Sequence, residues 1–83
     1  MSHEIVWEEG ALDTAAGFLK TDPDDLARLL DAVDALAEEP RPEGSFPYGS
    51  ENLRRMRVGR LRVLYEISEG TVTIVVLHVG RVP

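Results

Sequence analysis

Leu53 to Ile67 reads LRRMRVGRLRVLYEI, and this stretch decides the fold. It predicts two strands joined by a two-residue turn at Gly59-Arg60, because glycine readily adopts the positive φ that such a turn needs at its first position. Side chains alternate between the two faces of a strand, so one face of the hairpin is apolar and carries Met56, Val58, Leu61, Val63, Tyr65 and Ile67. The hairpin therefore predicts a sheet with a core on that side, and Tyr65 has no chemical role there.

The opposite face of the hairpin carries Arg55, Arg57 and Arg62, with Leu64 among them. In this register Arg57 lies directly across from Arg62, and such like-charge pairs are destabilising, within the ~0.2–1 kcal/mol typical of cross-strand pairs. Paired cations on one face suggest a bound anion, and phosphate is the usual partner of arginine. The simpler interpretation is a solvated face whose arginines pair with carboxylates of the chain or of a partner.

The totals of the chain limit what it can be. Its 83 residues predict a single domain, residues 1–83, with a modest core. The absence of cysteine excludes a disulfide and a thiolate metal site, and we expect no metal and no cofactor. The start, MSHEIVWEEG, lacks the features of a signal peptide, and no apolar run approaches the roughly 18 residues that span a membrane. We therefore expect a cytoplasmic protein without a membrane partner.

Charge is divided unevenly along the chain. Residues 1–50 carry 12 acidic and 3 basic side chains, and residues 51–83 carry 3 acidic and 6 basic ones, so that balances of −9 and +3 sum to the net −6. The acidic half argues against a general nucleic-acid-binding protein, whose domain is strongly basic. The arginine cluster still permits a local anion site on one face.

The residues before the hairpin predict a strand and two helices. His3 to Trp7 is a short β-rich run with Ile5 and Trp7 on one face. Glu8 to Lys20 predicts a helix, because apolar residues recur at helical spacing: Leu12, Ala15, Ala16 and Leu19.

A second helix is expected to run from Pro23 to about Glu39. Asp22 is the expected cap, and Pro23 suits the first helical position. The apolar stripe of this helix consists of Leu26, Leu29, Leu30, Val33, Leu36 and Ala37.

Pro40 to Ser50 (PRPEGSFPYGS) is rich in Pro, Gly and Ser and predicts a loop. We expect Phe46 and Tyr48 in it to cover the edge of the core. Stacking of these rings on a ligand is the alternative.

After a turn at residues 68–70, Thr71 to Val79 (TVTIVVLHV) predicts a central strand buried on both sides. His78, near its end, is expected to be structural rather than catalytic. Arg81 follows a glycine at the strand end, from where it can turn onto the face that carries the other arginines.

The predicted order is β-α-α-β-β-β, an α+β architecture with a small antiparallel-rich sheet and a helical hairpin on one face. The other face of the sheet stays open and carries the arginines of the central hairpin.

This pattern resembles the RelE/ParE superfamily of toxins from bacterial type II toxin–antitoxin systems. The resemblance covers nearly the whole chain and rests on the order of elements, the PRPEGS loop, the LRRMRVGRLRVLYEI hairpin and the final VVLHVGR strand. It implies the RelE-like fold and a cognate antitoxin as partner. RelE-like members are endonucleases that cut mRNA on the ribosome, so the resemblance also implies the ribosome and mRNA as partners.

The resemblance implies an RNA-cleaving site on the open sheet face. By position, Arg62 matches the family arginine of the R-V-x-Y segment, Arg55 and Arg57 match basic positions of the preceding strand, and Arg81 matches one just after the last V-G. The implied chemistry is attack of a 2′-hydroxyl on the adjacent phosphate, without a metal, with cations stabilising the developing charge. Arginine stays protonated and cannot be the base.

For the base, His78 is the only ring in this part of the chain that can exchange a proton near neutral pH. Arg60, in the hairpin turn, is a further candidate for phosphate binding. Two departures weaken the match to a nuclease. Many members continue into a tail with a catalytic aromatic residue or histidine, whereas this sequence stops at Pro83, and its pI of about 4.7 is low for a ribosomal ligand.

Three other functions stay open from the sequence. A toxin of the ParE kind inhibits DNA gyrase and needs no catalytic site. A degenerate toxin would only bind its antitoxin, and a solitary structural domain would have no cognate partner. The oligomeric state does not follow from the sequence.

Overall fold

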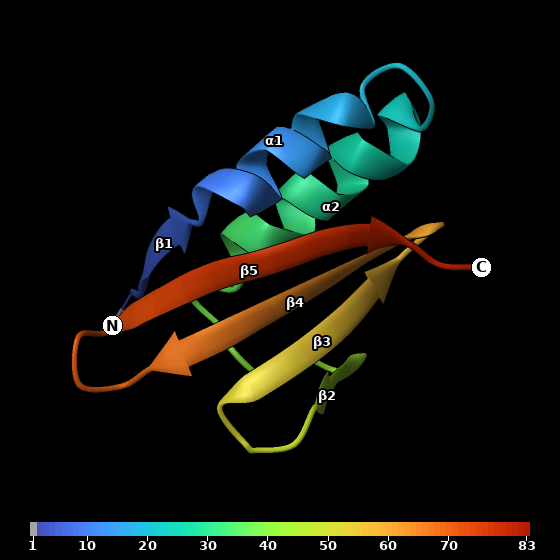
Figure 1. Cartoon of the computed structure of the whole chain (residues 1–83). Coiled ribbons are helices and arrows are strands. Elements are labelled where there is room, and N and C mark those ends of the chain that lie inside the picture. Colours follow the sequence, from blue (N-terminus) through green and yellow to red (C-terminus); the bar gives the residue numbers. More distant parts are fainter. Residues whose placement is uncertain (1) are drawn as a thin grey trace.

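Two helices pack on one face of a five-stranded mixed sheet in the computed structural model, which describes residues 2–83 (Figure 1). Along the chain the elements are β1 (Glu4–Trp7), α1 (Glu9–Gly17), α2 (Pro23–Ala35), β2 (Ser45–Pro47), β3 (Leu53–Val58), β4 (Leu61–Ser68) and β5 (Thr73–Arg81). The strand order is β1-β5-β4-β3-β2, with β1 parallel to β5 and the other pairs antiparallel. The predicted α+β architecture is confirmed.

The central hairpin, β3 and β4, has the predicted register. Val58 pairs with Leu61, and Arg57 pairs with Arg62. Gly59 has a φ of 60°, as the two-residue turn requires.

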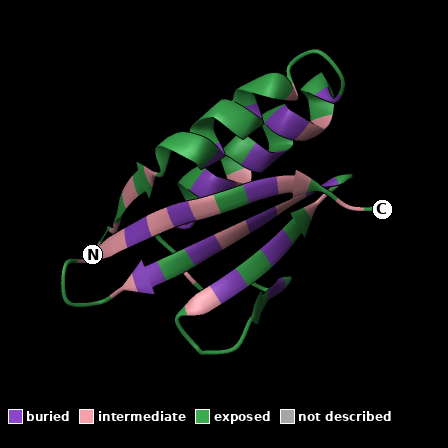
Figure 2. Cartoon of the chain, viewed as in Figure 1, coloured by how far each residue is buried: buried purple, intermediate pink, exposed green. Residues whose placement is uncertain are grey.

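The core lies between the sheet and the helical hairpin (Figure 2). It joins α2 to the inner faces of β3, β4 and β5, and its fully buried side chains are Leu29, Val33, Leu36, Leu61, Val63, Tyr65, Ile74, Val76 and Val79. Ile5 and Trp7 of β1 pack against its margin, on one face as predicted. Both helices lie on the same face of the sheet, so this core is on that side, and the outer surfaces of the helices are exposed.

The helix predictions were wrong in detail. α1 ends at Gly17 rather than Lys20, and α2 ends at Ala35 rather than Glu39. α1 buries Ala11 and Ala15, whereas Leu12 and Leu19 of the predicted stripe are 52% and 63% exposed. The physical reason is that α1 packs on β5 near the margin of the sheet, where only a narrow alanine face is covered. No helix within residues 2–83 has the length and apolar character needed to cross a membrane.

The predicted loop contains a strand that sequence reasoning missed. β2 adds to the edge of the sheet, with Ser45 opposite Met56 and Phe46 opposite Arg55. Ser45 therefore points inward and is buried, whereas Phe46 and Tyr48 are 61% and 51% exposed. The expectation that these two rings cover the edge of the core was wrong.

A β-bulge in β5 changes which residues face the core. Leu64 pairs with His78, whereas Tyr65 pairs with Val76, so Leu77 has no partner on β4. Val76 and Val79 are both buried, and the alternation therefore shifts by one residue between them. β5 is buried on one face only, because the outer side chains of its first half are half-exposed. The prediction of burial on both sides was wrong.

Candidate functional site

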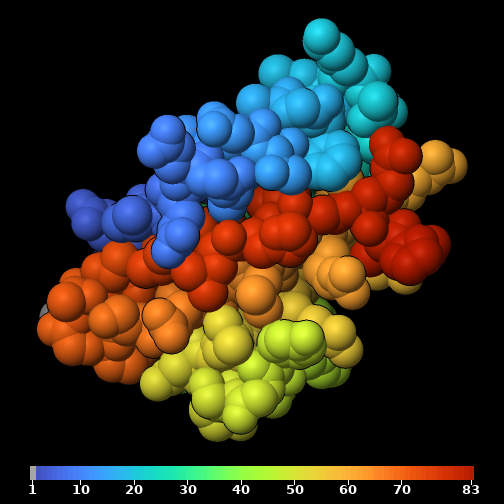
Figure 3. All heavy atoms as spheres, in the orientation of Figure 1, coloured from blue at the N-terminus to red at the C-terminus, as the bar shows by residue number. Residues whose placement is uncertain are grey.

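The face of β3, β4 and β5 opposite the helices is uncovered (Figure 3). Directly paired residues share a face, so two cross-strand rows can be read from the register. One row runs from β2 to β5 through Phe46, Arg55, Leu64 and His78, and the next contains Arg57, Arg62 and Gly80. We call the surface formed by Arg55, Arg57, Arg62 and His78 the arginine face.

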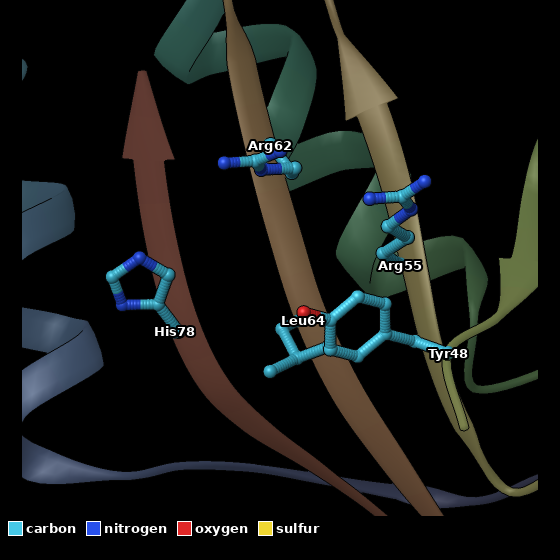
Figure 4. Close-up of a pocket in the computed structure, with 5 residues that line it drawn as sticks. All are labelled: Tyr48, Arg55, Arg62, Leu64 and His78. Carbon is cyan, nitrogen blue, oxygen red and sulfur yellow. The ribbon is translucent and has the colours of Figure 1, made fainter. Parts of the chain in front are cut away.

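A shallow hollow of about 130 Å³ lies on the arginine face. It is lined by Tyr48, Arg55, Arg62, Leu64 and His78 (Figure 4). In the close-up, the guanidinium groups of Arg55 and Arg62 lie on neighbouring strands, and the imidazole of His78 projects from β5 on the far side of Arg62. The hollow therefore brings two permanent cations and one imidazole to the same place.

No ion pair joins the cations of the arginine face to a carboxylate within residues 2–83. The ion pairs within residues 2–83 involve His3 and other arginines, namely Arg28, Arg41, Arg54 and Arg81, and no acidic residue lines the hollow. The described residues therefore do not show the predicted alternative in which these arginines pair with carboxylates of the same chain. An uncompensated group of guanidinium ions is the arrangement that binds phosphate or another anion.

A second hollow, of about 370 Å³, continues along the same face toward the hairpin turn. Arg57 lines it together with Arg55, Arg62 and Phe46. The Nε of Arg57 donates a hydrogen bond of 3.0 Å to the carbonyl oxygen of Gly59. This bond ties the side chain to the turn beside Arg62, so Arg57 can contribute charge at the end of the face.

Arg81 does not lie on the arginine face, contrary to the prediction. The bulge at Leu77 turns it to the helical side, where its guanidinium forms an ion pair with the buried carboxylate of Asp22. The same contact replaces the predicted cap, because the Asp22 side chain makes no capping hydrogen bond at the start of α2. The hydrogen bond from Arg81 lowers the pKa of Asp22, and a bond from Thr21 acts in the same direction.

Arg60 also lies apart from the arginine face. Its backbone N–H donates to Asp25 at 3.1 Å, and its side chain lines a separate hollow with the acidic start of α2. The structure thus gathers four of the six predicted site residues and leaves out Arg60 and Arg81.

Sequence reasoning missed the contribution of Gly80, and it gave a ligand contact of Tyr48 only as the alternative to a place at the edge of the core. The ring of Tyr48 reaches over the sheet beside Leu64, with the guanidinium carbon of Arg55 5.4 Å from its centroid. Gly80 lies opposite Arg62, and a Cβ there would be 3.1 Å from Nε2 of His78. The one sequence signal for Tyr48 was the alternation of Ser45, Phe46, Pro47 and Tyr48, which has the period of a strand.

Several chemistries follow from this geometry. Guanidinium groups can hold a phosphate and stabilise added negative charge on it. An imidazole can accept or donate a proton near neutral pH. No group of three histidine, aspartate or glutamate side chains suited to a metal ion occurs in the described part of the chain.

Solved structures with this architecture define its class. The isolated E. coli RelE toxin superposes with a TM-score of 0.83 at 19% identity, over 99% of this chain and 86% of that one. The RelBE2 toxin–antitoxin complex from Mycobacterium tuberculosis gives 0.76 at 25% identity, over 98% and 99%. A YoeB/ParE toxin from Agrobacterium tumefaciens gives 0.77 at 16% identity, over 94% and 97%. The chain therefore has the fold of the RelE-like toxins.

The sequence comparison narrows the class to a family. The model of the ParE toxin of type II toxin–antitoxin systems, parDE, matches residues 8–82. The chain therefore belongs to the ParE toxin family, within the RelE/ParE superfamily that its sequence resembles. No curated protein sequence matches the chain.

Proposed function

We propose that this toxin binds the RNA backbone on its arginine face and cleaves mRNA on the ribosome, without a metal ion. One observation carries the proposal: Arg55, Arg62 and His78 line a single hollow that no carboxylate enters. A scaffold that only had to be soluble would disperse these cations or pair them, because adjacent like charges across strands are destabilising.

The reaction is a transesterification at phosphorus. The 2′-oxygen of one nucleotide attacks the adjacent phosphate, a bond forms between this oxygen and phosphorus, and the bond from phosphorus to the 5′-oxygen of the next nucleotide breaks. The products are a 2′,3′-cyclic phosphate and a free 5′-hydroxyl, so no water and no cofactor are consumed. His78 takes the proton from the attacking hydroxyl as general base. The departing 5′-oxygen takes a proton from solvent and His78 returns its proton to solvent, so the overall reaction neither gains nor loses a proton.

The two arginines act on charge rather than on protons. In the transition state the non-bridging oxygens of the phosphate gain negative charge, and Arg62 and Arg55 stabilise it through their fixed forks of N–H donors. Arg57 adds charge at the end of the face. Arg81 and Arg60 have no part in this step, because their side chains lie elsewhere.

The proposed partners follow from the family and from the charge. Several of the similar structures are complexes with antitoxins. We propose a cognate antitoxin for this chain, with an acidic segment that neutralises the arginine face, and a cytoplasmic site of action where translated mRNA is found.

A second candidate is inhibition of DNA gyrase, the activity of ParE-type toxins. The observation in its favour is the family match itself, since it covers residues 8–82. This function requires a binding surface but no base, so it makes His78 dispensable.

The test is induced expression in cells, with mRNA ends mapped by primer extension. Arg62→Ala and His78→Gln are compared with Arg28→Ala, a matched control on α2 whose side chain is 66% exposed. Cuts at fixed codon positions on translated messages, lost in both site variants and kept in the control, are expected.

Intact messages with arrested growth and blocked DNA supercoiling would overturn the nuclease and support gyrase inhibition. Cleavage that survives His78→Gln would overturn the role of His78 and leave phosphate binding in place.

A further inference from the structure

We propose that Phe46 and Tyr48 form a platform on which two unpaired bases stack, so that the site accepts single-stranded RNA only. This inference rests on the proposed function and extends it from the phosphate to the bases. The platform belongs to the edge strand β2 and the residue that follows it.

The first argument is placement. Phe46 lies in β2 and Tyr48 directly follows this strand, and each ring lines a hollow on the arginine face. Phe46 pairs directly with Arg55, which places the rings on the arginine face rather than on the core side.

The second argument is exposure. Phe46 and Tyr48 are 61% and 51% exposed, although each could bury a large apolar area if it pointed inward. Neither ring is in the core, and each lines one of the two hollows beside Arg62. Exposed rings interleaved with arginines are the pattern with which proteins bind single-stranded nucleic acid.

The third argument is the orientation of Tyr48. Its ring lies 5.4 Å from the guanidinium carbon of Arg55, within the range of a cation–π contact. Figure 4 shows the hydroxyl end directed toward Leu64 and the middle of the hollow. A base stacked on this ring would therefore have its own phosphate within reach of the arginines.

The fourth argument is the rigidity of β2. A chain of hydrogen bonds anchors this strand to the core: Nε of Arg54 donates to Oγ of Ser45 at 2.7 Å, and Oγ of Ser45 lies 2.7 Å from the hydroxyl of Tyr65. Nη2 of Arg54 also donates to the carbonyl of Ser45 at 3.0 Å. The rings thus stand on a strand that is fixed before any ligand arrives, which lowers the entropic cost of binding.

Selection for single strands follows from the chemistry of stacking. In a double helix each base is stacked on its neighbours and its flat faces are covered, whereas the unstacked bases of a single strand can lie on aromatic rings. Because every base has such a face, the platform is tolerant of sequence.

The test separates bases from phosphates in the ligand. Fluorescence anisotropy at low salt compares a short 2′-O-methyl oligoribonucleotide, which cannot be cleaved, with an abasic oligonucleotide of the same length and charge. We expect the wild-type protein to prefer the ligand with bases by about 5- to 150-fold for each stacked base, which corresponds to 1–3 kcal/mol.

Variants assign this preference to residues. Tyr48→Leu and Phe46→Leu should each remove a large part of the preference, whereas Tyr48→Phe, which keeps the ring, should retain it. Arg62→Ala should weaken both ligands equally, because it removes charge and leaves the platform intact.

Two results would overturn the platform. One is a wild-type protein with no preference for the ligand with bases, as expected if the rings contact an antitoxin instead. The other is a preference that survives both leucine variants. Neither result alters the in-cell mapping of mRNA ends, so failure of the platform is distinguishable from failure of the nuclease.

Discussion

Tyr65→Phe is expected to destabilise the protein through one buried hydroxyl. Tyr65 is fully buried, and its hydroxyl donates to the carbonyl oxygen of Pro40 at 2.7 Å. Because a carbonyl can only accept, the hydroxyl of Ser45 must be the donor in its 2.7 Å bond to Tyr65. The substitution therefore removes two hydrogen bonds and leaves a buried serine hydroxyl without an acceptor.

The magnitude follows from these losses. Each bond contributes about 1 kcal/mol net, and an unsatisfied buried group adds further cost, so we expect a loss of about 2–3 kcal/mol in the free energy of unfolding. For a domain of this size that corresponds to a decrease in Tm of about 8–24 °C.

Urea denaturation followed by circular dichroism measures this loss. Tyr48→Phe is the matched control, because it removes the same atom from an exposed ring whose hydroxyl has no hydrogen bond within residues 2–83; its change should stay within about 0.5 kcal/mol. If Tyr65→Phe were as stable as this control, the hydrogen-bond chain would not anchor β2.

Three further predictions concern other contacts. Asp22→Asn should lower Tm at pH 7, and the difference in Tm from wild type should shrink as the pH falls below about 4. The reason is that a carboxylate whose pKa is lowered by folding stabilises the protein only while it is ionised. Thermal melts across this pH range measure the difference, and a difference that stays constant with pH would contradict the reasoning. Gly80→Ala places a methyl group 3.1 Å from Nε2 of His78, which should displace the imidazole. Cleavage of mRNA should therefore fall while stability in urea is unchanged or higher. Full cleavage by this variant would show that the methyl group does not displace His78. Gly59→Ala puts a β-carbon into the carboxylate of Asp25 at a positive φ, and should cost about 1–3 kcal/mol in a urea titration, with a smaller loss showing that the turn relaxes.

The hairpin and the layers of the fold could be predicted from the sequence because more than one sequence signal indicates the same structure. In β3 and β4, apolar and charged residues alternate at most positions, with Arg54 and Leu64 as exceptions, and Gly59 fixes the turn, so a single register satisfies both signals. From that register the positions of Arg55, Arg57 and Arg62 followed without any structure.

The orientation of the side chains in β5 was harder to predict, because its composition does not show which residues face the core. Thr73 to Val79 is apolar or β-branched at nearly every position, so alternation gives no sign of the bulge at Leu77. That single irregularity moves His78 out to the arginine face and Arg81 in to the helices. The sequence therefore assigned one of these two side chains to the wrong side.

β2 was missed because polarity and burial are reversed in it. Ser45 occupies the inner position, since its hydroxyl joins Arg54 to Tyr65, and Phe46 takes the outer one. Hydrophobic patterning places apolar side chains in the core, so it does not predict a buried serine that is stabilised by its hydrogen bonds.

The pairing of β1 with β5 has a consequence for how the protein folds while it is being synthesised. Glu4 of β1 lies beside Thr73 of β5 in parallel register. β1 is made first, but it can join the sheet only after β5 has been made. Such distant pairings are slow to form, since a long loop must close first. His78 arrives on that same last strand, and the hollow that it shares with Arg55 and Arg62 therefore does not exist while the earlier parts of the chain are being translated. The proposed site is therefore complete only after β5, the last strand of the sheet, has been made.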